Sequence, residues 1–319
     1  MKQPILRQAW LTAMLWSVVG LGWSQFYGVR SHFLMSGFLD NPAGVGNNPC
    51  LDLRLGVRSQ WAGFEGAPTS SFASLSGRLS EGAVVGHGLG GFVQTDETGP
   101  WSNTRFSMAY SSKIRLSTGA KLSAGFAAGM AQYKIDIESL DFPVYAASDD
   151  PVLFGSSGSQ VVFPSLDFGL WYEDASTFVS FSVLNVMATS LTELSMTTSS
   201  GRNMVLMGGK VIRLDRRFSF RPAAQMRLAQ GLPASLDIQG MFTLENKVSM
   251  GLGYRTGSAL VAVASFKVWD AMTLGYAYDF GVSSMHVASR NSHEIVLSLT
   301  ACDQKDPYIG PGGRCAAYD

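Results

Sequence analysis

Apolar and polar residues alternate along most of this chain after residue 50. The first such stretch reads Leu51-Asp52-Leu53-Arg54-Leu55-Gly56-Val57-Arg58. The same alternation returns in residues 106–116, 218–228, 248–255 and 294–299. Successive side chains of a β-strand point to opposite faces, so a period of two predicts strands with one apolar face and one polar face.

The boundaries of this pattern predict about fourteen strands. Most are near the ~9 to 11 residues of a tilted strand that crosses a membrane, whereas strands of soluble sheets usually have ~5 to 6 residues. The predicted strands are residues 51–61, 70–79, 84–94, 103–115, 119–134, 163–172, 177–187, 203–212, 218–229, 234–244, 248–256, 259–268, 272–280 and 293–301.

The connections between these strands alternate in length. Odd-to-even connections are mostly long, as in residues 135–162 and 188–202, and even-to-odd connections are short, as in residues 80–83 and 245–247. A soluble sandwich of two sheets would show the same alternation of residues. The even number of strands, their length and the loop asymmetry together favour an all-β fold, a transmembrane antiparallel β-barrel over residues 51–301.

In a membrane barrel the apolar face of each strand meets lipid and the polar face lines the lumen. Aromatic residues near strand ends, Trp61, Trp101, Tyr172 and Trp269, are then expected at the membrane interface. Buried charges need partners, so we expect a lumen held together by ion pairs and water, with a selective ion pathway as the alternative. The charged positions on the predicted inner face are Asp52, Arg54, Arg58, Asp167, Arg221, Arg227, Asp237, Arg255, Asp279 and Glu294.

The first 24 residues have the pattern of a signal peptide. Lys2 and Arg7 precede an apolar stretch over residues 9–21. About 13 apolar residues fall short of the ~20 that a spanning helix needs, which disfavours an uncleaved anchor helix. We therefore expect a signal peptide over residues 1–24, with cleavage after Ser24. Residues 25–50 are too apolar to remain in water and are predicted to form a short N-terminal plug in or under the barrel.

The composition agrees with a barrel and argues against other classes. The chain has 319 residues, 46% of them hydrophobic and 15% charged, and its 24 basic residues balance its 24 acidic residues. A neutral chain does not point to a nucleic acid partner. Beyond the N-terminus no apolar run reaches the ~18 residues that indicate a membrane helix.

No motif predicts an enzyme, a cofactor or a metal site. The run Gly86-His87-Gly88-Leu89-Gly90-Gly91 resembles a phosphate-binding turn, but it lies within a strand pattern and no helix follows it. A nucleotide site needs that helix N-terminus, so we interpret these glycines as room for close packing inside the barrel. The four histidines lack the spacing of metal ligands and are expected to be solvated loop residues. They are His32, His87, His286 and His293.

The three cysteines flank the predicted barrel in the sequence, one before its first strand and two after its last. Cys302 and Cys315 follow the last strand, in a segment over residues 302–319 that is rich in Gly and Pro and is predicted to be a periplasmic tail. In an oxidising compartment these two cysteines can form a disulfide. The sequence leaves open whether they do, and Cys50 would then be the odd thiol.

Seven short motifs, in their order along the chain, resemble one known family. The first combines Asn41-Pro42-Ala43 with the stretch Arg58-Ser59-Gln60-Trp61-Ala62-Gly63-Phe64-Glu65-Gly66-Ala67-Pro68-Thr69, and is similar to the opening of the PorP/SprF family of type IX secretion membrane proteins. The resemblance covers about residues 25–300. The further motifs are Gly88-Leu89-Gly90-Gly91, Phe163-Pro164-Ser165-Leu166-Asp167-Phe168-Gly169-Leu170, Phe220-Arg221-Pro222, Gly253-Tyr254-Arg255-Thr256, Leu274-Gly275-Tyr276-Ala277-Tyr278-Asp279 and His293-Glu294-Ile295-Val296-Leu297-Ser298.

The chain departs from this family at two places. The family usually reads Asn-Pro-Ala-Tyr-Ala-Gly where this chain has Asn41-Pro42-Ala43-Gly44-Val45-Gly46, and usually ends soon after the last strand where this chain continues to Asp319. The first variant also resembles the Asn-Pro-Ala-Gly of FadL-like barrels, whose N-terminal hatch plugs the lumen. Transport of hydrophobic solutes by a FadL-like barrel is therefore the alternative function.

The resemblance implies a barrel in the outer membrane of a Gram-negative bacterium of the Bacteroidetes type. The implied partners are outer-membrane lipid, a secreted cargo protein with a type IX C-terminal domain, often an adhesin of gliding bacteria, and other type IX secretion subunits. The implied mechanism is capture and anchoring of that cargo, without catalysis.

The residues that match the family motifs have two interpretations. One is contact with a partner. The other is structural, with Asn41-Pro42 as a turn, Gly63 and Gly66 as loop hinges, and Arg58 and Glu294 as paired charges of the lumen. The matching residues are Asn41, Pro42, Arg58, Trp61, Gly63, Gly66, Pro68, Asp279, His293 and Glu294.

Overall fold

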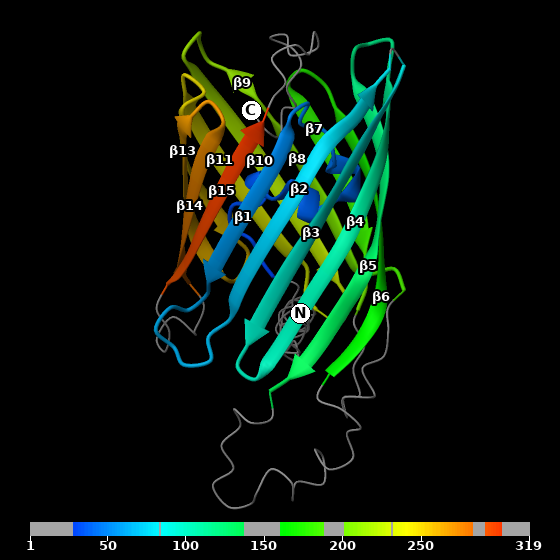
Figure 1. The fold of residues 1–319 in the computed structure, drawn as a ribbon. Coiled ribbons are helices and arrows are strands. Elements are labelled where there is room, and N and C mark those ends of the chain that lie inside the picture. The colour runs from blue at the N-terminus through cyan, green and yellow to red at the C-terminus, as the bar shows by residue number, and fades with distance from the viewer. Residues whose placement is uncertain are drawn as a thin grey trace, which may run out of the picture.

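The computed structural model describes residues 28–82, 84–136, 160–187, 201–230, 232–282 and 291–301. In this part of the chain, fifteen strands form one antiparallel sheet that closes into a barrel (Figure 1). The strands are β1 (Leu51–Ser59), β2 (Thr69–Glu81), β3 (Val85–Thr98), β4 (Trp101–Arg115), β5 (Lys121–Ile135), β6 (Gln160–Glu173), β7 (Thr177–Leu184), β8 (Asn203–Lys210), β9 (Ile212–Arg213), β10 (Phe218–Ala229), β11 (Ser235–Leu244), β12 (Val248–Arg255), β13 (Ala259–Trp269), β14 (Met272–Gly281) and β15 (Ser292–Ala301).

The ring is closed because every strand of it has two neighbours. The first strand, β1, pairs with β15 as well as with β2, and β10 pairs with β8 and β11. The two-residue strand β9 continues β8 along the same neighbour, so fourteen strands make up the ring of the described chain. The predicted antiparallel barrel of about fourteen strands is confirmed.

The strand bounds differ from the prediction by a few residues at most ends. Strand β7 ends at Leu184, because Asn185 has a φ of 54°, in the left-handed region that ends a strand. The predicted strand over residues 203–212 is interrupted at Val211, which separates β8 from β9. Local alternation indicates where a strand lies, but a single irregular residue inside it leaves no trace in the pattern.

The two ends of the barrel differ in their connections. At the short-turn end, the chain turns between β2 and β3, β4 and β5, β6 and β7, β11 and β12, and β13 and β14 within a few residues. This is the upper end in Figure 1, where β15 also ends. The long connections, between β1 and β2, β5 and β6, β7 and β8, and β14 and β15, lie at the opposite, long-loop end. The predicted asymmetry is present in part, because the connections between β3 and β4, β10 and β11, and β12 and β13 at the long-loop end are also short.

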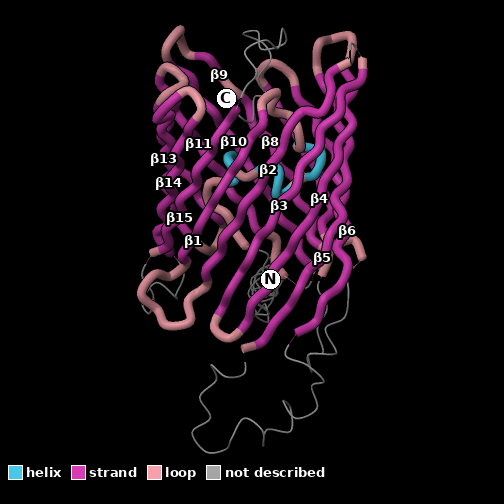
Figure 2. Tube along the Cα trace, in the orientation of Figure 1, coloured by secondary structure: helices cyan, strands magenta, loops and turns pink. Residues whose placement is uncertain are grey.

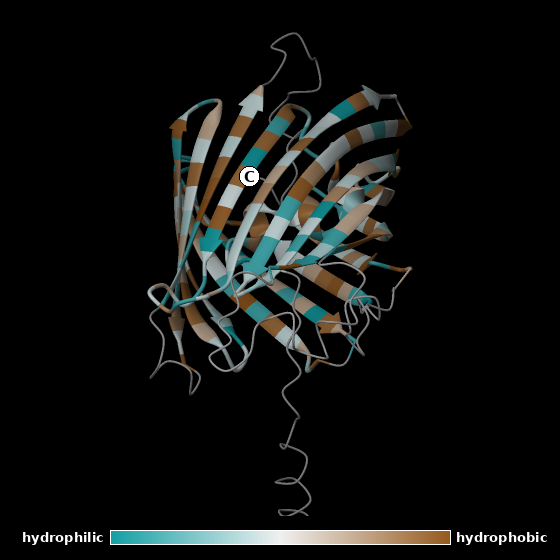
Figure 3. Ribbon diagram, turned by 60° about the horizontal axis from the view of Figure 1, so that its bottom comes forward, coloured by the Kyte–Doolittle hydropathy of each residue, from teal (hydrophilic) through white to brown (hydrophobic). Residues whose placement is uncertain are grey.

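The two faces of the wall separate apolar from charged side chains, as the bands of colour along each strand show (Figure 3). On β1, Leu55 and Val57 are exposed on the outside, whereas Arg54 and Arg58 are buried on the inside. Large apolar side chains continue around the outer face, up to Leu252 with 74% of its surface exposed. This outer face suits lipid. The charged residues predicted for the inner face do lie there, and all but Arg227 are buried in the described structure.

The aromatic residues near strand ends are placed differently from one another. Trp269 is 67% exposed at the short-turn end, and Tyr172 lies next to the fully buried Trp171 on the opposite face of β6. Trp61 lies in the connection between β1 and β2, and Trp101 shares the register of the buried Arg105 on the inner face of β4. The interface position predicted from strand ends therefore fits Trp269 and Tyr172, but Trp101 faces inward.

The lumen is crossed by the segment over residues 28–50, which we call the plug (Figure 2). It contains three short helices, η1 (Phe33–Met35), α2 (Gly37–Asp40) and η2 (Pro42–Gly44). A barrel with a short N-terminal plug was predicted, and this fold is confirmed. None of the helices in the described part of the chain has the length and apolar character needed to cross a membrane.

Apolar side chains of the plug pack against aromatic side chains of the wall. Phe33 belongs to a buried cluster with Trp171 and Phe178, whose rings stack with centroids 5.6 Å apart. Phe38 meets Phe92 edge to face, with ring centroids 5.7 Å apart. Aromatic pairs in this geometry add to the stabilisation that burial provides, so the plug is part of the barrel's core.

Glycines of the wall let the plug backbone come close. A Cβ on Gly88 would overlap the carbonyl oxygen of Val45, and a Cβ on Gly125 would lie 2.6 Å from the backbone nitrogen of Ala43. The glycines of β3 were predicted to make room for close packing, and Gly88 and Gly90 do so against Val45. Side chains at these positions would push the plug away from the wall.

Several expectations concern residues outside the described chain, or are wrong. The signal peptide, the tail over residues 302–319 with Cys302 and Cys315, and His286 all lie outside the described residues. Cys50 is disulfide-bonded, so the expectation of an odd thiol there is wrong.

Candidate functional site

The plug runs through the barrel from one half to the other. Its first described residue, Gly28, lies against Gln94 and Asp96 in the half of β3 toward the long-loop end. Its last residue, Cys50, precedes β1 at the short-turn end. The plug residues are intermediate or buried throughout, so their contacts with the wall define the candidate site.

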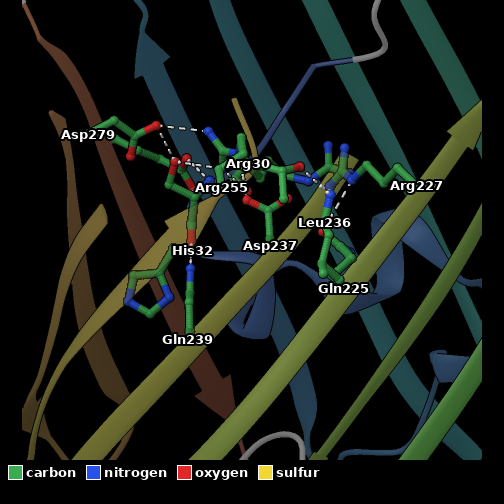
Figure 4. Close-up of polar contacts among 12 residues, drawn as sticks. Arg30, His32, Gln225, Arg227, Leu236, Asp237, Gln239, Arg255 and Asp279 are labelled. Carbon is green, nitrogen blue, oxygen red and sulfur yellow. Dashed lines mark hydrogen bonds and ion pairs between the residues drawn. The ribbon is translucent and has the colours of Figure 1, made fainter. Parts of the chain in front are cut away.

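Five charged side chains of the wall surround Ser31 of the plug. Its hydroxyl donates to Asp279 at 2.7 Å and accepts from Arg58 at 2.7 Å and from Arg255 at 3.1 Å. Four of the five residues come from the last strands of the chain and one from β1, and all five strands lie in one arc of the ring. Figure 4 labels Asp237, Arg255 and Asp279 of this set. We call this set the charge clamp: Arg58 of β1, Asp237 of β11, Arg255 of β12, Asp279 of β14 and Glu294 of β15.

The clamp also binds the plug backbone. The carboxylate of Glu294 accepts from the backbone N–H of Ser31 at 2.6 Å and from that of His32 at 3.1 Å. Gln239 donates to the carbonyl oxygen of Ser31 at 2.5 Å. Every polar group of Ser31 therefore has a partner on the wall, which satisfies the requirement that buried polar groups be hydrogen-bonded.

Within the clamp, charges of opposite sign alternate. Asp279 lies between two arginines, 2.8 Å from Arg58 and 2.9 Å from Arg255. Arg255 also pairs with Asp237 at 2.5 Å, and Arg58 with Glu294 at 3.3 Å. All five are buried. Because a buried charge is costly unless it is paired, each member of the clamp depends on the others.

A second polar group forms around Asp40, the last residue of α2. Its carboxylate pairs with Arg30 of the plug and lies 3.3 Å from Arg227, while Gln225 donates to it at 3.1 Å. Arg30 donates in turn to Gln94 of β3 at 3.1 Å. This group links the plug to β10, which pairs with the clamp strand β11, and to β3, two strands beyond β1; Figure 4 shows Gln225 and Arg227 close to Asp237 of the clamp.

The motif Asn41-Pro42 docks the plug on a third part of the wall. The amide of Asn41 donates to the carbonyl oxygens of Leu170 at 3.0 Å and Phe181 at 3.1 Å, on the paired strands β6 and β7. Its side-chain oxygen accepts from the backbone N–H of Ala43 at 2.9 Å and so caps helix η2, with Pro42 as the first helical residue. Asn41-Pro42 thus opens a single turn of 3₁₀-helix, in which the backbone N–H of Gly44 donates to the carbonyl oxygen of Asn41 at 3.0 Å, in agreement with the turn expected there.

The structure brings together only some of the residues that match family motifs. Arg58, Asp279 and Glu294 meet in the clamp, and the pairing expected between Arg58 and Glu294 is present. Asn41 and Pro42 hold the plug elsewhere in the lumen. The others lie at the long-loop end or on the outer face: Trp61, Gly63, Gly66, Pro68 and His293.

The motif between β1 and β2 shapes a loop. Three residues of this loop have positive φ values: 53° at Trp61, 89° at Gly63 and 69° at Gly66. Glycine adopts such values without strain, which explains the residue type at the last two positions. The backbone N–H of Trp61 donates to Ser292 at 3.2 Å, and Gly99 donates to the carbonyl oxygen of Gly66 at 2.9 Å. The loop is therefore tied to its neighbours on both sides.

The histidines are not solvated loop residues, and that expectation is wrong for three of them. His32 is fully buried in the plug. His87 lies in β3, with its Nδ1 2.6 Å from the hydroxyl of Tyr110, and His293 lies in β15, with its Nδ1 2.7 Å from the hydroxyl of Tyr276. In the part of the chain that is described, no group of three or more His, Cys, Asp or Glu residues is placed to hold a metal ion.

The sequence contains no signal for the plug residues that take part in this site. Arg255 and Asp237 were expected on the inner face because alternation predicts it, but Arg30, Ser31 and Asp40 lie in a segment without periodicity. Ser31 is separated from Glu294 by 263 residues, and no local signal links them. The arrangement holds a segment of chain by ion pairs and backbone hydrogen bonds.

Comparison with known proteins gives one family match and several similar folds. A family model described as "Type IX secretion system membrane protein PorP/SprF" matches residues 25–299. No curated protein matches the chain in sequence. Among solved structures, the toluene transporter TodX of Pseudomonas putida is 12% identical with a TM-score of 0.47, over 88% of this chain and 96% of that chain. An outer membrane protein of Acinetobacter baumannii is 7% identical with a TM-score of 0.44, over 79% of this chain and 99% of that chain.

Proposed function

We propose, from the premise that this chain belongs to the PorP/SprF family of type IX secretion system membrane proteins, that it helps to secrete a partner protein or anchor it at the cell surface. It would do so as a barrel in the outer membrane, with the long-loop end outside and the short-turn end in the periplasm. Its partners would be outer-membrane lipid, a cargo with a type IX C-terminal domain, and other type IX subunits. The role is binding, without catalysis.

The observation that carries this proposal is the extent of the family match, which spans residues 25–299 and so includes the plug as well as the ring. Within that span the motif residues Asn41, Arg58, Asp279 and Glu294 all hold the plug against the wall. A lumen occupied by a buried, multiply bonded plug suits a barrel that presents binding surfaces at its ends.

Transport of a hydrophobic solute is the second candidate, favoured by the sequence Asn41-Pro42-Ala43-Gly44. A site for such a solute is a mostly apolar pocket with a few polar groups. Around the plug, however, Arg58, Arg255 and Asp279 face inward and are engaged with one another and with Ser31. The composition of the lumen therefore supports the secretion proposal over transport.

Deletion of the gene separates the two functions. Intact cells of the deletion strain and its parent would be labelled with a membrane-impermeant biotin reagent, and the labelled and secreted proteins compared by mass spectrometry. We expect at least one protein with a type IX C-terminal domain to be lost from the surface and to return on complementation. Uptake of a radiolabelled long-chain fatty acid should be unchanged. Normal secretion together with reduced uptake would refute the proposal in favour of transport.

A further inference from the structure

Cys50, the last residue of the plug, carries a disulfide bond whose possible partners follow from the composition. The residue is buried and disulfide-bonded. The chain has three cysteines, and the other two, Cys302 and Cys315, both follow the last strand. The partner of Cys50 is therefore one of these two. Because a cysteine forms only one disulfide, Cys302 and Cys315 cannot be bonded to each other as well.

Cys50 lies at the seam of the ring, where the first strand of the chain meets the last. It directly precedes Leu51, whose register partner is Ala301, the last residue of β15. Figure 1 shows β1 and β15 side by side, with β15 ending at the short-turn end. Strand pairing from Leu51 to Ser59 holds this seam, and the disulfide of Cys50 lies directly beyond the end of that pairing.

Covalent geometry favours Cys302 as the partner. One peptide bond separates Cys50 from Leu51, and one separates Cys302 from Ala301. Residues directly opposite in an antiparallel pair have Cα atoms ~4.5 to 5.5 Å apart, and a disulfide spans ~4.4 to 6.8 Å between Cα atoms. A disulfide can therefore join Cys50 to Cys302 without displacing either strand. Cys315 is thirteen residues further along the chain, so holding it at the seam costs more conformational entropy.

We propose that Cys50 and Cys302 form a disulfide that closes the ring covalently at its seam. All strands of the barrel then belong to one covalent cycle, from residue 50 to residue 302. The first and last strands cannot separate at the short-turn end, even when the hydrogen bonds between them break. The same bond fixes the C-terminal end of the plug, because Cys50 is also the last plug residue. The inference does not depend on what the barrel secretes or binds.

The bond forms by exchange with a disulfide-bearing oxidant. The thiolate of one cysteine attacks a sulfur of the oxidant and makes a mixed disulfide, and the thiolate of the other cysteine then displaces the oxidant from it. The barrel gains one S–S bond and gives up two electrons and two protons, and the oxidant leaves as two thiols. This requirement suits a short-turn end in the periplasm, where disulfides form and persist.

Peptide mapping of the purified full-length barrel identifies the bond. The denatured protein would be alkylated without reduction and digested with trypsin, which places the three cysteines on separate peptides, residues 31–54, 291–305 and 315–319. We expect peptide 31–54 to be cross-linked to peptide 291–305, to separate from it on reduction, and peptide 315–319 to be alkylated. A cross-link between 31–54 and 315–319, or an alkylated Cys50, would overturn the proposal.

Thermal unfolding in detergent tests whether the bond holds the ring together. Cys302→Ser should unfold at a lower temperature than the unaltered protein, because a cross-link between residues far apart in the sequence restricts the unfolded chain. A reducing agent should lower the unfolding temperature of the unaltered protein by the same amount and leave that of Cys302→Ser unchanged. If Cys302→Ser does not fold, reduction of the folded, unaltered protein supplies the measurement.

The matched control is Cys315→Ser, which removes the other cysteine of the same tail. It should keep both the unfolding temperature of the unaltered protein and its response to the reducing agent. A loss of that response in Cys315→Ser, or an unaltered protein whose unfolding temperature does not change on reduction, would show that no Cys50–Cys302 bond holds the seam.

Discussion

Individual residues of the wall hold the plug by contacts that admit little substitution. Arg58 illustrates this, since its guanidinium bonds two carboxylates of other strands and the hydroxyl of Ser31 at once. Its side chain is 5% exposed, so water cannot replace the partners that a substitution removes. A buried ion pair adds little net stability when whole, but its disruption is costly because the remaining charges stay buried.

We therefore expect Arg58→Met to lower the free energy of unfolding by about 3 to 5 kcal/mol, since Asp279 and Glu294 lose a buried partner. Thermal unfolding of the purified barrel in detergent, followed by circular dichroism, measures this. Arg217→Met is the matched control, because Arg217 pairs with Glu245 at 3.5 Å with 74% of its side chain exposed. Such an exposed pair contributes about 0 to 1 kcal/mol. Equal effects of the two substitutions would contradict the clamp.

A second residue-scale prediction concerns Gly169 of β6. A Cβ there would overlap the side-chain oxygen of Asn41, so Gly169→Ala should displace the plug from this part of the wall. Overpacking of this kind typically costs about 1 to 3 kcal/mol. Gly208→Ala is the control, because a Cβ at Gly208 would make only ordinary contacts at 3.4 and 3.7 Å. If urea unfolding shows the same loss for both variants, close approach at Gly169 is not the reason.

At the scale of elements, the short turns keep adjacent strands in register. The turn between β6 and β7 is organised by Asp174, whose carboxylate accepts from the backbone N–H of Ser176 and of Thr177, both at 2.8 Å. The hydrogen bond from the backbone of Ser176, aided by that from Thr177, holds the pKa of the Asp174 carboxyl below its usual value. The turn is therefore stabilised by the ionised form of this residue.

Because the pKa of Asp174 is lowered on folding, its contribution is complete above the ordinary pKa of a carboxyl group and is lost as the pH falls through the lowered value. Asp174→Ala should lower the free energy of unfolding by about 1 kcal/mol at neutral pH, and by less at a pH of about 2. Asp174→Asn keeps an acceptor but does not titrate, so it should lose less than Asp174→Ala at neutral pH and differ little from the unaltered protein at a pH of about 2. Urea unfolding at both pH values checks this, and a pH-independent loss in Asp174→Ala would contradict it.

At the scale of the whole molecule, the closed ring and the plug depend on each other. The ring leaves no free strand edge in the described chain, and the plug fills its centre with buried side chains from Phe33 to Val45. The clamp, the Asp40 group and Asn41 fasten the plug to the arc from β10 to β1, to β3, and to the pair β6 and β7. Such a barrel is expected to be closed to ions at rest.

This expectation can be tested in planar lipid bilayers. The unaltered protein should give little conductance, and a variant without residues 28–47 should give stable open-channel steps, because the lumen loses its plug. If the deletion variant does not fold, the double variant Arg58→Met/Arg255→Met, which weakens the clamp only, should show intermittent openings. Equal steady conductance in the unaltered protein and in either variant would show that the plug does not seal the barrel.

Processing of the N-terminus is a further prediction for the whole chain. We expect mass spectrometry of the outer-membrane fraction to find Gln25 as the first residue, which is also where the family match begins. Blocking cleavage by a bulky residue at position 24, as in Ser24→Trp, should retain residues 1–24. Recovery of Met1 or Lys2 at the N-terminus of the unaltered mature protein would reject this expectation.

The sequence by itself determined the strands and their two faces. Alternation is a local property, since each side chain's face follows from its place in the strand. This is why β10 (Phe218–Ala229) begins and ends where it was predicted, and why Asp237 and Arg255 were expected inside. The structural interpretation of Arg58 and Glu294 as paired charges of the lumen rested on the same alternation, and the two side chains do pair, at 3.3 Å.

Only the tertiary structure decided which of these inward-facing side chains contact one another and which plug residues they bind. Ser31 reaches Glu294 across 263 residues and Asp279 across 248, because ring closure and the path of the plug bring those segments together. His32, expected in a solvated loop, is buried by that path, and the irregular plug has no period from which its contacts could be read. Local pattern determines the face of a residue, whereas its partner depends on how the whole chain closes.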